Sequence, residues 1–148
     1  MLRTASTWFF LAPDATGHIT PEVLSEALTE DTILLSCQLV NNEIGTVQPV
    51  EQLGRLLKAK APKALFHIDA VQGLCRVRLT PKKWNCDLMS VSGHKIGAPK
   101  GIGALYVKKG LRLPPLTFGG GQERGDASRH RGRADIAALS RRCEIRMA

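Results

Sequence analysis

The sequence predicts an α/β layer sandwich built on a largely parallel sheet. Short apolar runs that end in a polar residue recur along the chain, and a segment with helical spacing separates two of them. Parallel neighbouring strands need a crossover of that kind. The chain has 148 residues, of which 43% are hydrophobic and 23% are charged, as expected for one globular domain.

A first helix is expected over residues 21–28. Pro21 suits the first position of a helix, and Thr20 before it has a side chain of the kind that caps helix N-termini. The apolar residues that would face inward are Val23, Leu24, Ala27 and Leu28.

The first strand is expected over residues 32–40. This run is mostly apolar, which favours a strand buried on both faces, and it ends in the polar pair Asn41 and Asn42. A loop with Gly45 follows, and Pro49 then opens a crossover helix. The apolar residues of that helix that fall at helical spacing are Val50, Leu53, Leu56 and Leu57.

Three more short apolar runs predict three more strands. Residues 64–68 end at Asp69, residues 87–91 end at Ser92, and residues 103–107 precede a basic turn. Only residues 92–102 join the last two strands, which is too short for a parallel crossover, so the last strand is expected to be antiparallel. Polar groups at strand ends matter because ligands of such folds bind at the carboxyl ends of strands.

The net charge is 21 − 13 = +8, which raises the question of nucleic-acid binding. The excess is uneven: residues 126–148 hold six arginines against three acidic residues and have no aromatic side chain for base stacking. We therefore expect a solvated basic tail and no specific nucleic-acid partner. A basic binding module that acts through this tail stays open as a weaker alternative.

The cysteines and the N-terminus give the expected compartment. The chain has no Cys-x-x-Cys pair, so its cysteines suggest neither a zinc site nor a disulfide framework. No metal is therefore expected, and a cytoplasmic location fits. Residues 1–11 hold only a short apolar run, too short for a signal peptide or a membrane span. Three cysteines lie in or beside predicted core elements and are expected to be small buried apolar side chains, namely Cys37, Cys75 and Cys86.

The stretch from Ser92 to Lys95 carries the strongest chemical signal. A strand ends there in a hydroxyl, an imidazole (His94) and an amine on a glycine-rich turn, which could cradle a phosphate. A lysine in such a place can form a Schiff base with a carbonyl compound. From spacing alone, however, Lys95 is better explained as a surface lysine of a loop.

A second candidate group lies around Asp69. A carboxylate at a strand end is the partner that a protonated pyridine nitrogen needs, and Gln72 could return to the same side in a turn. Asp69 is equally well explained as the cap of a following helix. His67, two residues earlier, is expected to be a packed core histidine and no ligand.

Four motifs in order resemble one family. The sequence Asn-Asn-Glu-Ile-Gly stands at 41–45, His-Ile-Asp-Ala-Val-Gln at 67–72, a Ser-Gly-His-Lys stretch with its glycine-rich continuation at 92–106, and Gly-Gly-Gly-Gln-Glu-Arg-Gly at 119–125. Together they resemble the NifS/IscS-like cysteine desulfurases, within the class V aminotransferase group of fold-type I pyridoxal-phosphate (PLP) enzymes. The resemblance implies a fragment of the three-layer PLP-binding large domain over residues 10–125, between an uncertain extension (1–9) and a divergent Arg-rich tail (126–148).

The resemblance also implies roles for the candidate residues. Lys95 would hold the cofactor as a Schiff base and move the proton at the substrate Cα, and Asp69 would pair with the pyridine nitrogen. Gln72 and Asn42 would lie near the ring hydroxyl. Ser92 and His94 would bind the cofactor phosphate.

The implied reaction converts L-cysteine to L-alanine and leaves persulfide sulfur on an enzyme cysteine, for iron–sulfur cluster or thiolation pathways. The parent enzyme would be a homodimer that works with sulfur-acceptor proteins, away from membranes. Selenocysteine lyase or another class V aminotransferase is an alternative that shares these motifs. A non-catalytic truncated remnant is a further alternative.

Some family features are expected to lie outside this chain. These are a Gly-Thr-Glu phosphate motif, a ring-stacking histidine and the sulfur-accepting cysteine. The position of Cys143 does not assign it the role of that cysteine. After Gly125 the family continues with Arg-x-Gly-Thr-x-Asn, and the different sequence here suggests a frameshift or gene truncation. We therefore expect the isolated chain to bind PLP weakly, to be inactive alone and to be poorly soluble.

Overall fold

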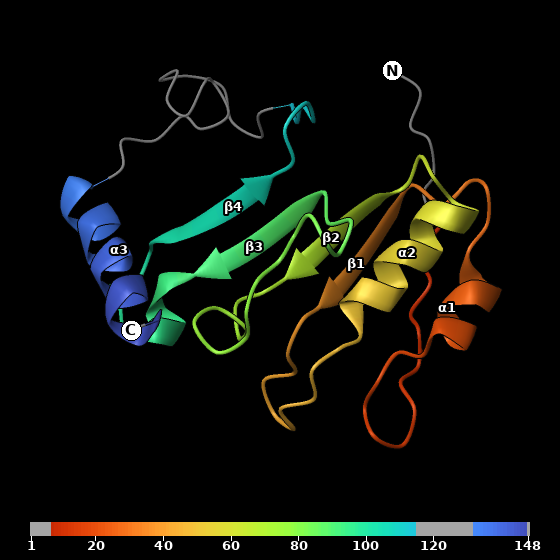
Figure 1. Ribbon diagram of the computed structural model, residues 1–148, viewed down its shortest axis with the longest axis horizontal. Helices are drawn as coiled ribbons and strands as arrows, with labels where there is room; N and C mark the ends of the chain where they lie inside the picture. The colour runs from red at the N-terminus through yellow and green to blue at the C-terminus, as the bar shows by residue number, and fades with distance from the viewer. Residues whose placement is uncertain (1–6, 115–131, 148) are drawn as a thin grey trace.

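The protein forms a four-stranded sheet with helices gathered at its two ends (Figure 1). This computed structural model describes residues 7–114 and 132–147. The motif at 119–125 and part of the tail at 126–148 lie outside the described residues. In chain order the elements are α1 (Pro21–Ala27), β1 (Leu34–Gln38), α2 (Val50–Lys60), β2 (Leu65–Asp69), β3 (Leu88–Ser92), the 3₁₀-helix η1 (Gly93–Ile96), β4 (Gly103–Val107) and α3 (Arg133–Met147).

The sheet has the predicted mixed topology. The strand order is β1-β2-β3-β4, the first three strands are parallel, and β4 is antiparallel to β3. Ser92 at the end of β3 pairs with Gly103 at the start of β4, and the Gly93 N–H donates to the Ile102 carbonyl at 2.9 Å. The short connection between these strands therefore forces the reversal that the sequence predicts.

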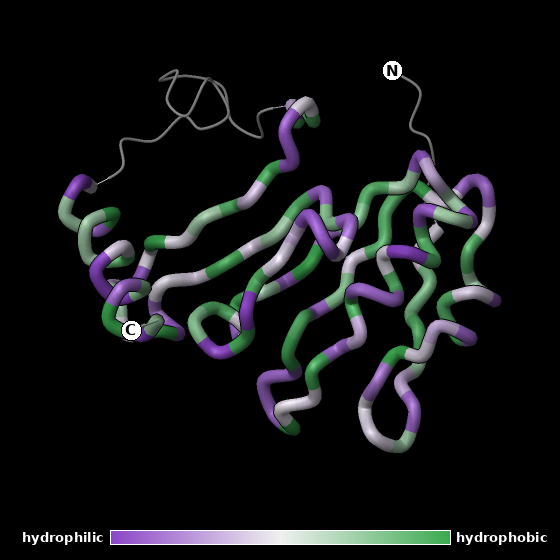
Figure 2. Tube along the Cα trace, viewed as in Figure 1, coloured by the Kyte–Doolittle hydropathy of each residue, from purple (hydrophilic) through white to green (hydrophobic). Residues whose placement is uncertain are grey.

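Helices α1 and α2 pack together on one face of the sheet and form the core with it. The Thr20 hydroxyl accepts from the Val23 N–H at 3.3 Å, so the predicted helix cap is confirmed. Figure 2 shows apolar stretches along the strands and mixed polar and apolar positions along α2. The fully buried side chains that meet in this core include Leu24, Leu39, Leu53, Leu57, Phe66 and Ile68.

The first strand is shorter and more exposed than predicted. The expectation of a strand buried on both faces over residues 32–40 is wrong, because β1 spans Leu34–Gln38 as an edge strand and alternates between half-buried and exposed residues. Ile33 and Leu34 are 69% and 42% exposed. Within the described residues, helices cover only the sheet face of Phe66 and Ile68, so Leu34, the one apolar residue of β1 on the other face, is left partly in solvent.

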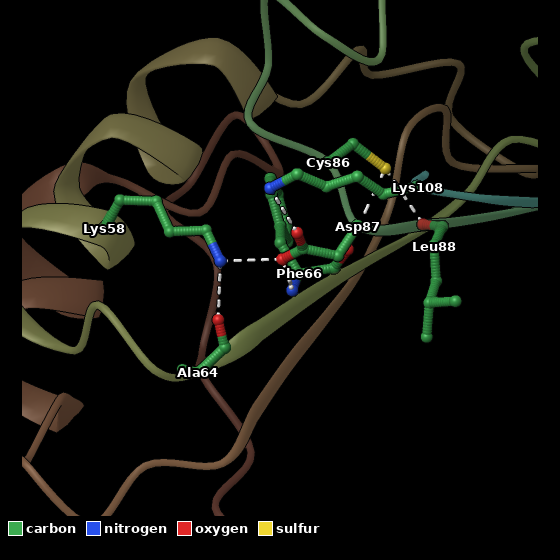
Figure 3. A network of polar contacts seen from close by, with 7 residues as sticks. All are labelled: Lys58, Ala64, Phe66, Cys86, Asp87, Leu88 and Lys108. Atoms are coloured by element: carbon green, nitrogen blue, oxygen red, sulfur yellow. Dashed lines mark hydrogen bonds and ion pairs between the residues drawn. The ribbon is translucent and has the colours of Figure 1, made fainter. Parts of the chain in front are cut away.

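A buried carboxylate joins three strands and α2 at the amino end of β3 (Figure 3). The Asp87 side chain is only 5% exposed and accepts hydrogen bonds from Lys58 Nζ at 2.6 Å, Lys108 Nζ at 2.9 Å and the Phe66 N–H at 3.0 Å. Lys58 Nζ also donates to the Ala64 carbonyl at 2.6 Å. Burial raises the pKa of Asp87, but these hydrogen bonds outweigh burial and hold that pKa below its ordinary value.

Candidate functional site

The candidate site lies at the carboxyl ends of β2 and β3, where each strand runs into a turn. Asp69 is the last residue of β2 and Ser92 the last residue of β3. Asp69 is in register with Ser90, and Ser92 lies two residues further along the same strand. Because side chains alternate along a strand, Asp69, Ser90 and Ser92 all point to the sheet face that α2 does not cover.

The Asp69 carboxylate shapes the turn that follows β2. Its Oδ1 accepts from the Val71 N–H at 2.9 Å, and its side chain is exposed. A turn follows here instead of the helix that a capping role would require. In the part of the chain that the structure describes, this is the single hydrogen bond of the carboxylate.

Arg76, which sequence analysis did not single out, ties the two turns together. Its Nη1 donates to the Gln72 carbonyl at 2.9 Å and to Gln72 Oε1 at 3.2 Å, and its Nη2 donates to the Lys95 carbonyl at 3.2 Å. Gln72 and Lys95 therefore lie on adjoining turns. No motif marks an arginine in this role, and only its place four residues after Gln72 hints at it.

The 3₁₀-helix η1 presents polar side chains on a buried base. Gly93 and Ile96 are buried, whereas His94 and Lys95 are exposed. The Ser92 hydroxyl is 2.8 Å from His94 Nδ1, which holds hydroxyl and imidazole together. The turn ends at Gly97, whose φ of +85° is a left-handed conformation that favours glycine. Of the predicted cluster, the hydroxyl and the imidazole are in contact, and Lys95 follows them on the same 3₁₀-helix.

Asn42 follows β1, the strand that neighbours β2. It is exposed on the turn after β1, and no hydrogen bond in the described chain joins it to Asp69, Gln72 or Lys95. Its neighbour Asn41 builds that turn, because Asn41 Oδ1 accepts from the Glu43 and Ile44 N–H groups at 2.9 and 3.1 Å. A role for Asn42 near the ring hydroxyl therefore remains a prediction.

His67 is not the packed core residue that was expected. It projects from the sheet face opposite α2, where Nδ1 is 2.8 Å from the Ser36 hydroxyl and Nε2 is 2.8 Å from the Ser90 hydroxyl. Burial lowers the pKa of His67, while the charge of Asp69 opposes that shift. The alternation of β2 places this residue on the same face as Asp69, which accounts for the difference.

The donor set at these two turns fits PLP. An exposed carboxylate suits a protonated pyridine nitrogen, and an exposed lysine suits the aldehyde. A hydroxyl and an imidazole that are already hydrogen-bonded to each other suit a phosphate. The described groups on these turns are Asp69, Gln72, Ser92, His94 and Lys95.

The described residues bear on two further kinds of element, metal-binding groups and membrane-spanning helices. No group of three or more His, Cys, Asp or Glu side chains in residues 7–114 and 132–147 has a metal-binding arrangement. None of the helices in these ranges has the length and apolar character to cross a membrane.

Comparison with known proteins identifies the family. The family model described as aminotransferase class V matches residues 3–135. The chain is 42% identical over 138 residues to the protein named cysteine desulfurase IscS of Clostridium botulinum, and 45% identical over 136 residues to the protein named cysteine desulfurase 2 of Trichormus variabilis. These alignments cover 93% and 92% of this chain and 34% of each relative, so the chain spans about a third of their length.

Solved structures give the same result. A structure named NifS-like protein superposes with a TM-score of 0.89 at 39% identity, over 93% of this chain and 38% of that one. A structure named SspA in complex with cysteine superposes with a TM-score of 0.87 at 39% identity, over 92% of this chain and 39% of that one. Class V aminotransferases, including the cysteine desulfurases, are PLP-dependent enzymes. The α/β fold, the two turns and these matches together establish that the chain belongs to the aminotransferase class V family.

Proposed function

We propose that this chain is the central part of the PLP-binding domain of a cysteine desulfurase. The activity belongs to the whole protein, since the chain spans about a third of the relatives that it matches. The proposed substrate is L-cysteine, and the products are L-alanine and enzyme-bound persulfide sulfur for acceptor proteins. The similarity to SspA, whose solved structure is a complex with cysteine, supports L-cysteine as the substrate.

Each candidate residue has a proposed part in holding the cofactor. Lys95 would hold the cofactor through its aldehyde carbon and would carry the proton that moves at the substrate Cα, and Asp69 would accept a hydrogen bond from the pyridine nitrogen. Ser92 and His94 bind the phosphate, and Gln72 contributes near the ring hydroxyl. When bound, PLP supplies an electron sink for bond cleavage at Cα.

The observation that carries the proposal is the joining of the two turns by one guanidinium. Arg76 donates both to Gln72 on the turn after β2 and to the Lys95 carbonyl on the turn after β3. Asp69 and Ser92 end neighbouring parallel strands and face the same side of the sheet. A lysine amine and a carboxylate at adjoining strand ends are the two fixed points that a pyridine ring with an aldehyde requires.

The proposed attachment site is tested with PLP and the 148-residue chain. Incubation with PLP should give a visible absorbance band, and borohydride reduction should leave a pyridoxyl group that peptide mapping locates on Lys95. The Lys95→Ala variant should lose both signals. Lys100→Ala is the matched control, because Lys100 is an exposed lysine in the same loop and should leave both signals intact.

The outcomes separate the alternatives. A pyridoxyl group on lysines other than Lys95, in equal yield in the wild type and in Lys95→Ala, would refute the proposed site. Absence of any lysine-dependent band would favour a non-catalytic remnant. For the whole protein, we expect a homodimer in the cytoplasm whose substrate preference is measured as alanine formed from L-cysteine and from L-selenocysteine.

A further inference from the structure

Helix α3 lies against the turn of residues 93–97 that carries Lys95, which we call the lysine turn. Figure 1 shows α3 beside β4, the strand at this edge of the sheet. Arg142 Nε donates to the Gly97 carbonyl at 2.9 Å, and the guanidinium lies against Gly97 so closely that an added Cβ would meet it at 3.0 Å. Residues 133–147 contain no buried side chain, so α3 has little apolar packing to hold it in place. Its docking therefore depends on a few contacts around this turn.

Two cysteines are each next in sequence to an arginine that donates a hydrogen bond to the lysine turn. Cys75 directly precedes Arg76, which donates to the Lys95 carbonyl at 3.2 Å. Cys143 directly follows Arg142, which donates to Gly97. Both cysteines are half-buried, and the two backbone segments that carry them are anchored to the same short turn.

The side chains of Cys75 and Cys143 are close enough to influence each other. Burial raises the pKa of the Cys143 thiol, and a hydrogen bond with the Cys75 side chain raises it further. Cys75 has a φ of +58°, a left-handed conformation that is uncommon for a residue other than glycine or asparagine.

From this arrangement we infer that Cys75 and Cys143 are a reversible dithiol–disulfide pair that fastens α3 onto the lysine turn. The oxidant is a low-molecular-weight disulfide, and the reductant is a low-molecular-weight thiol. The inference concerns only the thiols and α3, so it holds whether or not the chain binds a cofactor.

The exchange proceeds in two balanced steps. The thiolate of one cysteine attacks a sulfur of the small disulfide and expels one small thiolate, which leaves a mixed disulfide on the protein. The second cysteine, as its thiolate, attacks the protein sulfur of that mixed disulfide and expels the second small thiolate. The protein loses two hydrogens as protons and two electrons, and one small disulfide becomes two small thiols.

The other two cysteines lack these features and serve as internal controls. Burial raises the pKa of Cys37 and of Cys86 to about 11 each, so both are poor nucleophiles at neutral pH. The Cys37 thiol donates to the Gln38 carbonyl at 3.2 Å, and the Cys86 thiol donates to the Leu88 carbonyl at 2.9 Å.

The test is peptide mapping of the 148-residue chain after treatment with glutathione disulfide at pH 8 and blocking of the remaining thiols. Trypsin separates the four cysteines, because Cys75 falls in peptide 64–76, Cys86 in peptide 84–95 and Cys143 in peptide 143–146, while Cys37 lies in a long N-terminal peptide. We expect peptide 64–76 linked to peptide 143–146, and loss of this link after dithiothreitol. The link should form faster as the pH rises, because burial holds the Cys143 thiol protonated.

Matched variants and a second readout complete the test. Cys75→Ser and Cys143→Ser should each lose the linked peptide, whereas Cys37→Ser should retain it. In the oxidised protein, amide hydrogen exchange in peptides that cover residues 93–97 should slow, because the fastened helix keeps the turn closed. Glutathione adducts on single cysteines without the linked peptide, links that involve Cys37 or Cys86, or links only between two chains would overturn the inference.

Discussion

The polar groups at the two ends of strand β3 differ in their exposure to solvent. At its amino end, Asp87 is buried and takes three hydrogen bonds, two of them from lysine ammonium groups. At its carboxyl end, Ser92 leads into η1, where His94 and Lys95 stand exposed. The polar group at the amino end is hydrogen-bonded within the protein, whereas those at the carboxyl end stay available for a ligand.

This difference separates stability from binding within one strand. A buried charge must be paired, because an unpaired one is very costly, so any change at Asp87 should act on folding. An exposed group at the carboxyl end contributes little to folding, so a change at Lys95, or at Asp69 at the neighbouring end of β2, should act on binding. Variants at the two ends should therefore fall into two classes that do not overlap.

The largest effect on folding is expected from Asp87→Ala. The change removes the acceptor of the Phe66 N–H and the charged partner of Lys58, which keeps only the Ala64 carbonyl, and breaking a buried pair in this way costs about 3 kcal/mol. Urea unfolding followed by circular dichroism should show the lower midpoint. A midpoint within error of the wild type would mean that the network contributes nothing net.

The second effect concerns binding and sharpens the contrast. Asp69→Asn keeps the size of the side chain and an oxygen for the Val71 N–H, so the free energy of unfolding should change by less than about 0.5 kcal/mol. The charged partner of the pyridine nitrogen is lost, so PLP affinity should fall about ten-fold, as expected when a charge-assisted hydrogen bond is removed. Spectroscopic titration of both proteins with PLP measures the ratio. An unchanged affinity would remove Asp69 from the proposed site.

The third effect is a pH dependence of stability at the Asp87 end. The pKa of Asp87 is lower in the folded protein than its ordinary value of 3.8, so its stabilising contribution is complete above that value. The contribution is lost as the pH falls below 3.8 and through the folded pKa. Unfolding midpoints between about pH 7 and pH 2.5 should therefore fall more steeply for the wild type than for Asp87→Asn. Parallel curves for the two proteins would contradict this assignment.

The smallest effect is expected from Lys108→Met. Lys108 is 53% exposed and its ion pair with Asp87 is open to water, so its loss should cost about 0.5 kcal/mol. Lys58→Met should cost more, because Lys58 is less exposed and also donates to the Ala64 carbonyl. Urea unfolding of the two variants in parallel gives this order. The reverse order would show that burial does not set the strength of these pairs.

Much of the fold could be predicted because local signals agreed with the tertiary arrangement. The apolar runs before Asp69 and Ser92 became β2 and β3, and the short link of residues 92–102 required the antiparallel β4. Thr20 and Pro21 marked the start of α1 correctly. These elements follow from hydrophobic spacing and capping, which are properties of a few neighbouring residues.

The remaining features depend on partners that are distant in the sequence. Asp87 looked like the start of an apolar strand, and only the fold brings Lys58 and Lys108 to it. Arg76 carries no motif, although it links the two turns of the site. The half-exposed character of β1 could not be predicted either, because burial depends on what covers a strand.

The reversal of the chain after β3 has a further consequence for Lys95. The loop that carries it is closed at its base by the pairing of Ser92 with Gly103 and by the hydrogen bond from Gly93 to Ile102, so its ends are fixed before any ligand arrives. A molecule that binds there does not have to order this loop, so little conformational entropy of the chain is lost on association. The loop that carries Lys95 is in this respect preorganised for binding.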